Sequence, residues 1–266
     1  MERVSMNLEI ISCEPESNPN PTPIVFVHGM WHGAWVWAEN FMPYFSQHGY
    51  ASYALSLRGH STSESNKAIR WVRLRDYVED VAQVIQQCQS VPILIGHSMG
   101  GVIVQKYLET HLSPAAVLLA SGPASGLLPS ALSFAKHHPV SFLKSSLKMS
   151  PAPLVETPQL YRELFFSETI PNSRLLEYYG KLSNESYGVV LDMMRFDLPD
   201  PRRVKTPILV IGASDDRSVL PREFEATAKL YQTKAVMFKM AHNMMLEDGW
   251  SKVADCILGW LDERKL

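Results

Sequence analysis

Short apolar runs alternate with helical patterns along most of this chain. The run Ile24–Val27 is wholly apolar, which is typical of a strand buried on both faces. Asp76–Gln87 instead carries apolar residues at helical spacing. The alternation predicts an α/β fold with a mostly parallel central sheet and helices on both faces. The expected strands are Leu8–Ser12, Ile24–Val27, Tyr50–Leu57, Ile93–Ile95, Ala115–Ala120, Ile208–Ile211 and Ala235–Phe238. The expected helices of this part are Trp37–His48, Asp76–Gln87, Gly101–Leu108, Pro221–Leu230 and Trp250–Leu261.

The alternation stops between Gly122 and Lys205, where strand patterns disappear and prolines separate helical segments. The expected helices there are Ser130–His137, Leu160–Phe166 and Ser173–Leu182. This segment starts just after one strand and ends just before another. It should therefore lie over the carboxyl edge of the sheet, where open α/β folds bind ligands. We expect a core domain of residues 1–121 and 206–266 with a helical cap inserted at 122–205. A separate accessory domain is the alternative.

Composition narrows the class of protein. The chain has 266 residues, of which 46% are hydrophobic and 20% charged, enough for one large core. A net charge of −2 gives no basic surface for nucleic acid. No apolar run has the length of a signal peptide or of a membrane-spanning helix, so we expect no stable membrane insertion. The three cysteines lie far apart and outside any Cys/His cluster, which favours free thiols, no metal site and a cytoplasmic location. Oligomeric state stays open.

A short segment with a serine at its centre follows the fourth expected strand directly. The sequence Gly96-His97-Ser98-Met99-Gly100 stands between that apolar run and an apolar helical pattern. The outer glycines of such a G-x-S-x-G turn let strand and helix pack closely around a strained nucleophile. The serine oxygen then lies at the start of a helix, where backbone N–H groups favour a developing negative charge. The context predicts that Ser98 is a nucleophile.

A nucleophilic serine needs a base, and that base needs a group to orient it. His242 lies on the loop between the last expected strand and the last helix. Asp215 and Asp216 follow the strand Ile208–Ile211. All of these residues lie at carboxyl ends of strands, in the order Ser, Asp, His. The pattern predicts a Ser-His-Asp triad and leaves Asp215 and Asp216 as alternatives for the acid.

Acyl transfer also needs two backbone N–H groups aimed at the carbonyl oxygen as it becomes an oxyanion. One should belong to Met99, which follows the nucleophile. The other should come from the loop after strand Ile24–Val27, where the sequence His28-Gly29-Met30 places the N–H of Met30.

These motifs together resemble the α/β-hydrolase superfamily from Ile24 to the closing helix. The stretch from His28 to Trp35 looks like the oxyanion loop of plant methylesterases and hydroxynitrile lyases. The resemblance implies an α/β-hydrolase fold and a serine hydrolase with no cofactor. Aligning the strand before the two aspartates favours Asp216 as the triad acid, while the spacing to Pro221 keeps Asp215 open.

Several further side chains are candidates for the site. Trp31, Met193 and Phe196 are the expected substrate-binding residues, with packing in the core as their alternative role. His97 should point away from Ser98 into the fold. His32 and His60 are more typical of solvated loop positions than of the site entrance.

We therefore expect a carboxylic-ester hydrolase that forms an acyl-enzyme on small to medium apolar esters. Thioester or lactone hydrolysis would use the same groups. The alternatives are a lyase of the hydroxynitrile type and a catalytically silent receptor for small molecules. Only the hydrolase forms an acyl-enzyme, so detection of an acyl-enzyme distinguishes it from these two alternatives.

Overall fold

A seven-stranded sheet forms the centre of the protein, as described for residues 6–266 by a computed structural model. Its spatial order is β1-β3-β2-β4-β5-β6-β7, and only the pairing of β1 with β3 is antiparallel. The expected mostly parallel sheet is confirmed; the first five residues of the expected core domain lie outside the described residues. The strands are β1 (Ile10–Cys13), β2 (Ile24–Val27), β3 (Ser52–Leu55), β4 (Ile93–His97), β5 (Ala116–Leu119), β6 (Ile208–Ala213) and β7 (Ala235–Phe238).

The register of the central strands decides where the loops leave the sheet. β2 and β4 are parallel neighbours, and Val27 lies beside Gly96 in their pairing. Both strands are buried along their whole length, as their apolar sequences require. The loop that begins at His28 and the turn that holds Ser98 therefore emerge side by side at one edge of the sheet.

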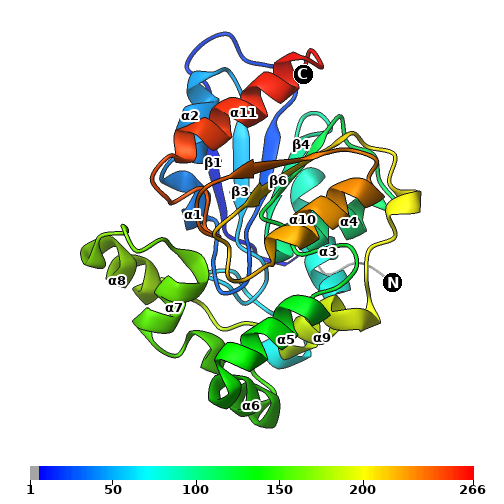
Figure 1. Ribbon diagram of the computed structural model, residues 1–266. Helices are drawn as coiled ribbons and strands as arrows, with labels where there is room; N and C mark the ends of the chain where they lie inside the picture. Colours follow the sequence, from blue (N-terminus) through cyan, green and yellow to red (C-terminus); the bar gives the residue numbers. More distant parts are fainter. Residues whose placement is uncertain (1–5) are drawn as a thin grey trace.

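Helices cover both faces of the sheet (Figure 1). One face carries α1 (Trp35–Ala38), α2 (Phe41–Gln47) and α11 (Trp250–Asp262). The other carries α3 (Leu74–Ile85), α4 (Met99–Leu108) and α10 (Pro221–Leu230).

The expected single helix Trp37–His48 is in fact two helices, α1 and α2. Pro43 lies in the first turn of α2. A proline ring clashes with the carbonyl four residues earlier, so a helix cannot run through from residue 37, and it restarts at Phe41 instead.

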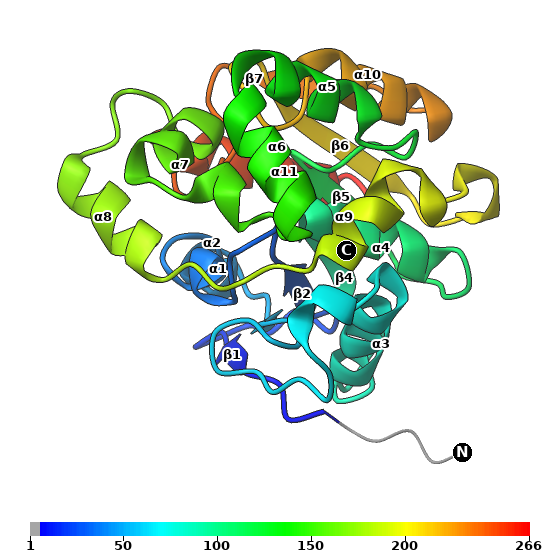
Figure 2. The ribbon, with the colours of Figure 1, turned by 90° about the horizontal axis from the view of Figure 1, so that it is seen from below.

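Between β5 and β6 the chain leaves the sheet and forms a helical segment, residues 122–205, which we call the cap. Seen from below, its helices lie across the carboxyl ends of the strands (Figure 2). The prolines that interrupt this segment begin helices, because the first turn needs no backbone N–H. The cap helices are α5 (Leu128–His137), α6 (Pro139–Lys148), α7 (Pro158–Phe165), α8 (Asn172–Gly180), α9 (Tyr187–Leu191) and the π-helix η3 (Asp192–Phe196). The short 3₁₀ helices are η1 (Ile69–Trp71), η2 (Ala152–Val155) and η4 (Pro201–Arg203).

Candidate active site

Ser98 occupies a strained turn between β4 and α4. Its backbone has φ 53° and ψ −119°, a conformation that residues other than glycine rarely adopt. The flanking glycines permit the turn by their lack of a side chain. A Cβ atom on Gly100 would lie 2.2 Å from the carbonyl oxygen of Val27, and one on Gly96 would lie 2.5 Å from that of Gly100. The helix can therefore begin against the sheet only with glycine at these positions.

Three side chains that are distant in sequence form one hydrogen-bonded chain. Ser98 Oγ lies 2.9 Å from His242 Nε2, and His242 Nδ1 lies 2.6 Å from Asp216 Oδ2. The carboxylate requires a proton on Nδ1, which leaves Nε2 free to accept the serine proton. Asp216 is held in turn by the backbone N–H groups of Ser218 and Val219, both on its Oδ1 at 2.8 and 2.9 Å.

The two aspartates have different surroundings. Asp216 is buried against His242, whereas Asp215 is exposed and its carboxylate accepts a hydrogen bond from Ser214. The position favoured by the resemblance is therefore the one that contacts the histidine.

His97 points away from Ser98 and supports the histidine loop from behind. It is buried, its Nε2 donates to the carbonyl oxygen of His242 at 3.0 Å, and the two rings lie 4.7 Å apart. Burial and the neighbouring His242 lower the pKa of His97 well below its ordinary value. A neutral His97 thus fixes the loop without adding charge beside the site, in agreement with the expected packing role.

The loop from His28 to His32 passes beside Ser98 and is held by its own histidines. His28 Nε2 accepts from the N–H of Leu57, so its Nδ1 donates to the carbonyl oxygen of Gly29 at 2.7 Å. His32 Nδ1 donates to the carbonyl oxygen of Met30 at 2.7 Å. Burial is the main cause that lowers the pKa of both histidines, that of His32 to about 3. We call residues 28–32 the oxyanion loop.

The two backbone N–H groups expected as oxyanion donors have no hydrogen-bond partner among the described residues. Met99 is the first residue of α4, so its N–H has no carbonyl one turn earlier to accept it. Among the described residues, no hydrogen bond occupies the N–H of Met30. Met30 and Ser98 line the same cavity.

That cavity has a volume of about 170 Å³ and reaches Ser98 and His242 under the cap. Its walls are mostly apolar, with the hydroxyl groups of Ser130, Ser145 and Ser146 among them. A wider hollow of about 740 Å³ beside α7 and α8 has neither Ser98 nor His242 in its lining. The apolar lining of the smaller cavity includes Leu127, Phe134, Phe142, Leu164, Val190 and Met194.

Of the three expected substrate-binding residues, one lines the cavity and two do not. Trp31 lines the cavity, as expected. Met193 and Phe196 do not: Met193 is 1% exposed in the core, and Phe196 is 74% exposed at the surface. Their neighbour Met194 lines the cavity instead. Met193 takes the alternative role in the core; the segment 192–196 is a π-helix, whose wider turn spaces successive side chains differently from an α-helix.

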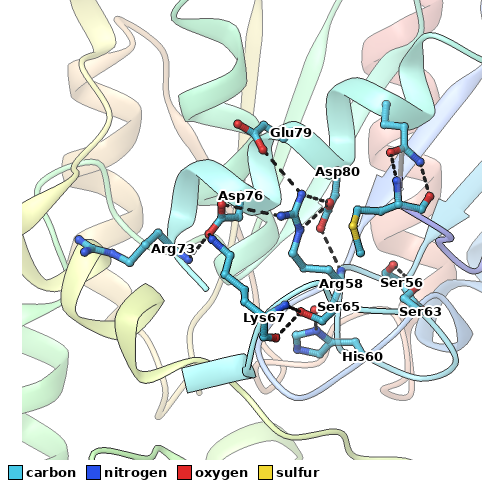
Figure 3. A network of polar contacts seen from close by, with 12 residues as sticks. Ser56, Arg58, His60, Ser63, Ser65, Lys67, Arg73, Asp76, Glu79 and Asp80 are labelled. Atoms are coloured by element: carbon cyan, nitrogen blue, oxygen red, sulfur yellow. Dashed lines mark hydrogen bonds and ion pairs between the residues drawn. The ribbon is translucent and has the colours of Figure 1, made fainter. Parts of the chain in front are cut away.

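The prediction that His32 and His60 are solvated is also wrong, because both are buried. His60 lies on the loop between β3 and η1, which a network of ion pairs anchors to α3 (Figure 3). Arg58 donates to Asp80 through Nε at 2.8 Å and Nη2 at 2.6 Å, and Lys67 lies 2.6 Å from Asp76. This network holds the segment that brings His60 under the oxyanion loop.

The sequence pattern of the alpha/beta hydrolase family matches residues 24–255. The chain belongs to this family. Among curated proteins, none matches it.

Several solved structures share the fold at low sequence identity. The esterase EaEST of Exiguobacterium antarcticum superposes with a TM-score of 0.72 at 17% identity, over 97% of this chain and 96% of that one. A protein described as the non-heme bromoperoxidase BpoC of Mycobacterium tuberculosis superposes with a TM-score of 0.79 at 19% identity, over 100% of this chain and 99% of that one. Est816, described as an N-acyl homoserine lactone degrading enzyme, superposes with a TM-score of 0.67 at 18% identity, over 97% of this chain and 98% of that one. At these identities the likeness establishes the fold alone.

Within residues 6–266, no group of three or more His, Cys, Asp or Glu side chains could hold a metal ion. None of the helices described has both the length and the apolar character to cross a membrane.

Proposed function

We propose that this alpha/beta hydrolase family member is a carboxylic-ester hydrolase with Ser98 as its nucleophile. The observation that carries the proposal is the continuous hydrogen-bonded chain from Ser98 through His242 to Asp216 at one end of an apolar cavity. A base in contact with the hydroxyl, itself oriented by a buried carboxylate, is the arrangement that activates serine.

Acylation follows from the positions of the atoms. Ser98 Oγ forms a bond to the ester carbonyl carbon while its proton passes to His242 Nε2. Asp216 stabilises the imidazolium, and the N–H groups of Met30 and Met99 receive the negative charge that develops on the carbonyl oxygen. The carbon–oxygen bond to the alcohol then breaks, and the alcohol leaves with the proton from His242.

Deacylation repeats these steps with water in place of the alcohol. His242 takes a proton from a water molecule as its oxygen bonds to the acyl carbon. The second oxyanion collapses, the bond to Ser98 Oγ breaks, and the serine recovers a proton from His242 as the carboxylic acid is released.

The cavity supports small to medium esters with apolar groups as substrates. Its walls include leucine, phenylalanine, valine and methionine side chains, and most of the residues that line it belong to the cap. Lactones and thioesters present the same electrophilic carbon to Ser98. The lactone-degrading activity ascribed to Est816 supports their inclusion in a substrate screen.

A fluorophosphonate probe tests the nucleophile directly. Intact-protein mass spectrometry should show one adduct on the wild-type protein and none on Ser98→Ala. Quenched reactions with a p-nitrophenyl ester should in addition show one acyl group on Ser98. Labelling without any acyl-enzyme, combined with cleavage of cyanohydrins, would indicate a lyase. Equal labelling of Ser98→Ala, or no labelling of either protein, would refute the proposal, and no labelling would favour a binding protein.

A further inference from the structure

A carboxylate from the cap lies buried beneath the oxyanion loop. Glu185, in the connection between α8 and α9, has a side chain that is 0% exposed. Its Oε2 lies 3.2 Å from the N–H of Trp31 and 3.1 Å from His60 Nε2. Its Oε1 accepts from the hydroxyl of Tyr77 at 2.9 Å and from the N–H of Ser186 at 2.6 Å. Burying a carboxylate costs free energy unless hydrogen-bond partners compensate it, and these four partners provide that compensation for Glu185.

The charge of Glu185 is balanced by His60. Both ring nitrogens of His60 face acceptors, Nε2 the carboxylate and Nδ1 the carbonyl oxygen of Arg58 at 3.3 Å, an arrangement that favours the doubly protonated imidazolium. Burial lowers the pKa of His60, but the Glu185 carboxylate together with hydrogen bonds to the carbonyl oxygens of Arg58 and Leu57 raises it above its ordinary value. The cap and the core are therefore joined by a buried ion pair directly below the loop.

This pair contacts the peptide group that follows the oxyanion donor. The peptide between Met30 and Trp31 is held at both ends: its carbonyl accepts from His32, and its N–H donates to Glu185. The preceding peptide, which carries the N–H of Met30, is held by the bond of the Gly29 carbonyl to His28. Trp31 itself has φ 63°, a left-handed conformation that costs energy unless its surroundings hold it.

We propose that Glu185 is a positioning residue, which fixes the oxyanion loop through the Trp31 N–H and so sets the direction of the Met30 N–H. The inference rests on the proposed hydrolase function, because it assigns Glu185 to the stabilisation of that oxyanion. It makes the cap a part of the catalytic machinery as well as a wall of the substrate cavity.

The test compares two carboxylates of the cap that form hydrogen bonds to the core, those of Glu185 and Asp192. Glu185→Met removes the acceptor at similar length. Asp192→Leu is the matched control, because Asp192 is equally buried and binds Arg73 and the N–H of Leu74 but does not touch the oxyanion loop. Glu185→Gln keeps one acceptor oxygen and serves as the conservative variant. Thermal melting establishes that each protein is folded, and the assay uses p-nitrophenyl acetate, whose short acyl group makes few cavity contacts.

The readout must separate positioning from general damage. Loss of a complete oxyanion donor lowers kcat by ~10²–10³, so a donor that is present but misdirected should lower it by roughly ten- to a hundredfold. We expect this for Glu185→Met, with KM within about twofold, a smaller loss for Glu185→Gln, and kcat within about threefold of wild type for Asp192→Leu. The inhibition constant of a trifluoromethyl ketone, whose adduct on Ser98 carries an oxyanion, should rise by the same factor as kcat/KM falls. That constant does not depend on the fraction of active protein.

Equal losses of kcat in Glu185→Met and Asp192→Leu, or an unchanged trifluoromethyl ketone constant, would overturn the proposal. If Glu185→Met does not fold, Glu185→Gln decides by the same two measurements. The two ideas fail differently. A wild-type protein that is never acylated on Ser98 removes the proposed function, whereas an acylated wild type whose Glu185 variants keep their kcat removes only the role of Glu185.

Discussion

Replacing Asp216 with asparagine exchanges one oxygen for an amino group at the far end of the triad. The structure decides which way the new amide points. Oδ1 of Asp216 accepts two backbone N–H groups, from Ser218 and Val219, and an amino group cannot replace it there. The amide oxygen must therefore keep that position, and the amino group must face His242 Nδ1, where Asp216 Oδ2 now lies at 2.6 Å.

The consequence is a change of tautomer. Nδ1 of His242 would accept from the amino group, so the ring proton would reside on Nε2 and point at Ser98 Oγ, 2.9 Å away. A protonated Nε2 cannot take the serine proton. The same exchange in a serine protease lowers kcat by ~10⁴, which corresponds to about 5.4 kcal/mol of transition-state stabilisation at 1.36 kcal/mol per tenfold. We expect a loss of this order for Asp216→Asn.

The assay is hydrolysis of p-nitrophenyl acetate at constant pH, with burst titration to count the active protein. Asp215→Asn is the matched control. Asp215 is exposed and its carboxylate accepts only from the Ser214 hydroxyl among the hydrogen bonds of the described residues, so kcat should stay within about twofold. A loss below tenfold for Asp216→Asn, or a larger loss for Asp215→Asn, would refute the tautomer argument.

Two other predictions concern the cavity and the ion pairs below it. Phe134→Ala should lower kcat/KM for hexanoyl and longer esters by roughly 10- to 200-fold and leave the acetyl ester nearly unchanged, since Phe134 lines the cavity. Phe196→Ala should leave kcat/KM unchanged for esters of every chain length, because Phe196 is exposed. If Phe134→Ala instead lowers kcat/KM by one common factor at every chain length, Phe134 is not a specificity element. Burial raises the pKa of Asp76, but hydrogen bonds from Lys67 and a backbone N–H lower it below its ordinary value. Its stabilisation is therefore present at neutral pH and lost as the pH falls through that lowered pKa, so Lys67→Met should cost up to about 1 kcal/mol in urea unfolding at pH 7. The difference from wild type should begin to shrink below about pH 4, where the aspartates of the unfolded chain become protonated, and a difference that grows as the pH falls further would contradict this sign.

The sequence by itself determined the sheet and the edge of the sheet at which the candidate site lies. The expected bounds of β2, β7 and α10 match those of the structure. Buried strands are short and wholly apolar, and such runs are recognisable without knowledge of their neighbours. Ser98 follows β4 directly, and Asp216 and His242 lie on the loops that follow β6 and β7. Because parallel strands end at one edge, residues at their carboxyl ends meet there whatever the rest of the chain does.

The tertiary structure alone decided which side chains of the cap reach the site. Helical spacing indicates which residues share a face, but it does not say which face meets the core. Met193 and Met194 are neighbours of the same residue type in the π-helix at 192–196, yet Met193 is buried in the core and Met194 lines the cavity.

Glu185 and His60 show the same limit for charge. In sequence each is an ordinary polar residue of a connection, and the usual place for such a residue is the surface. They are buried because each satisfies the other across 125 positions of the chain, together with Tyr77 and the Trp31 N–H. The free energy of a buried charge depends on the partners that surround it. Those partners come from distant segments, and only the folded chain brings them together.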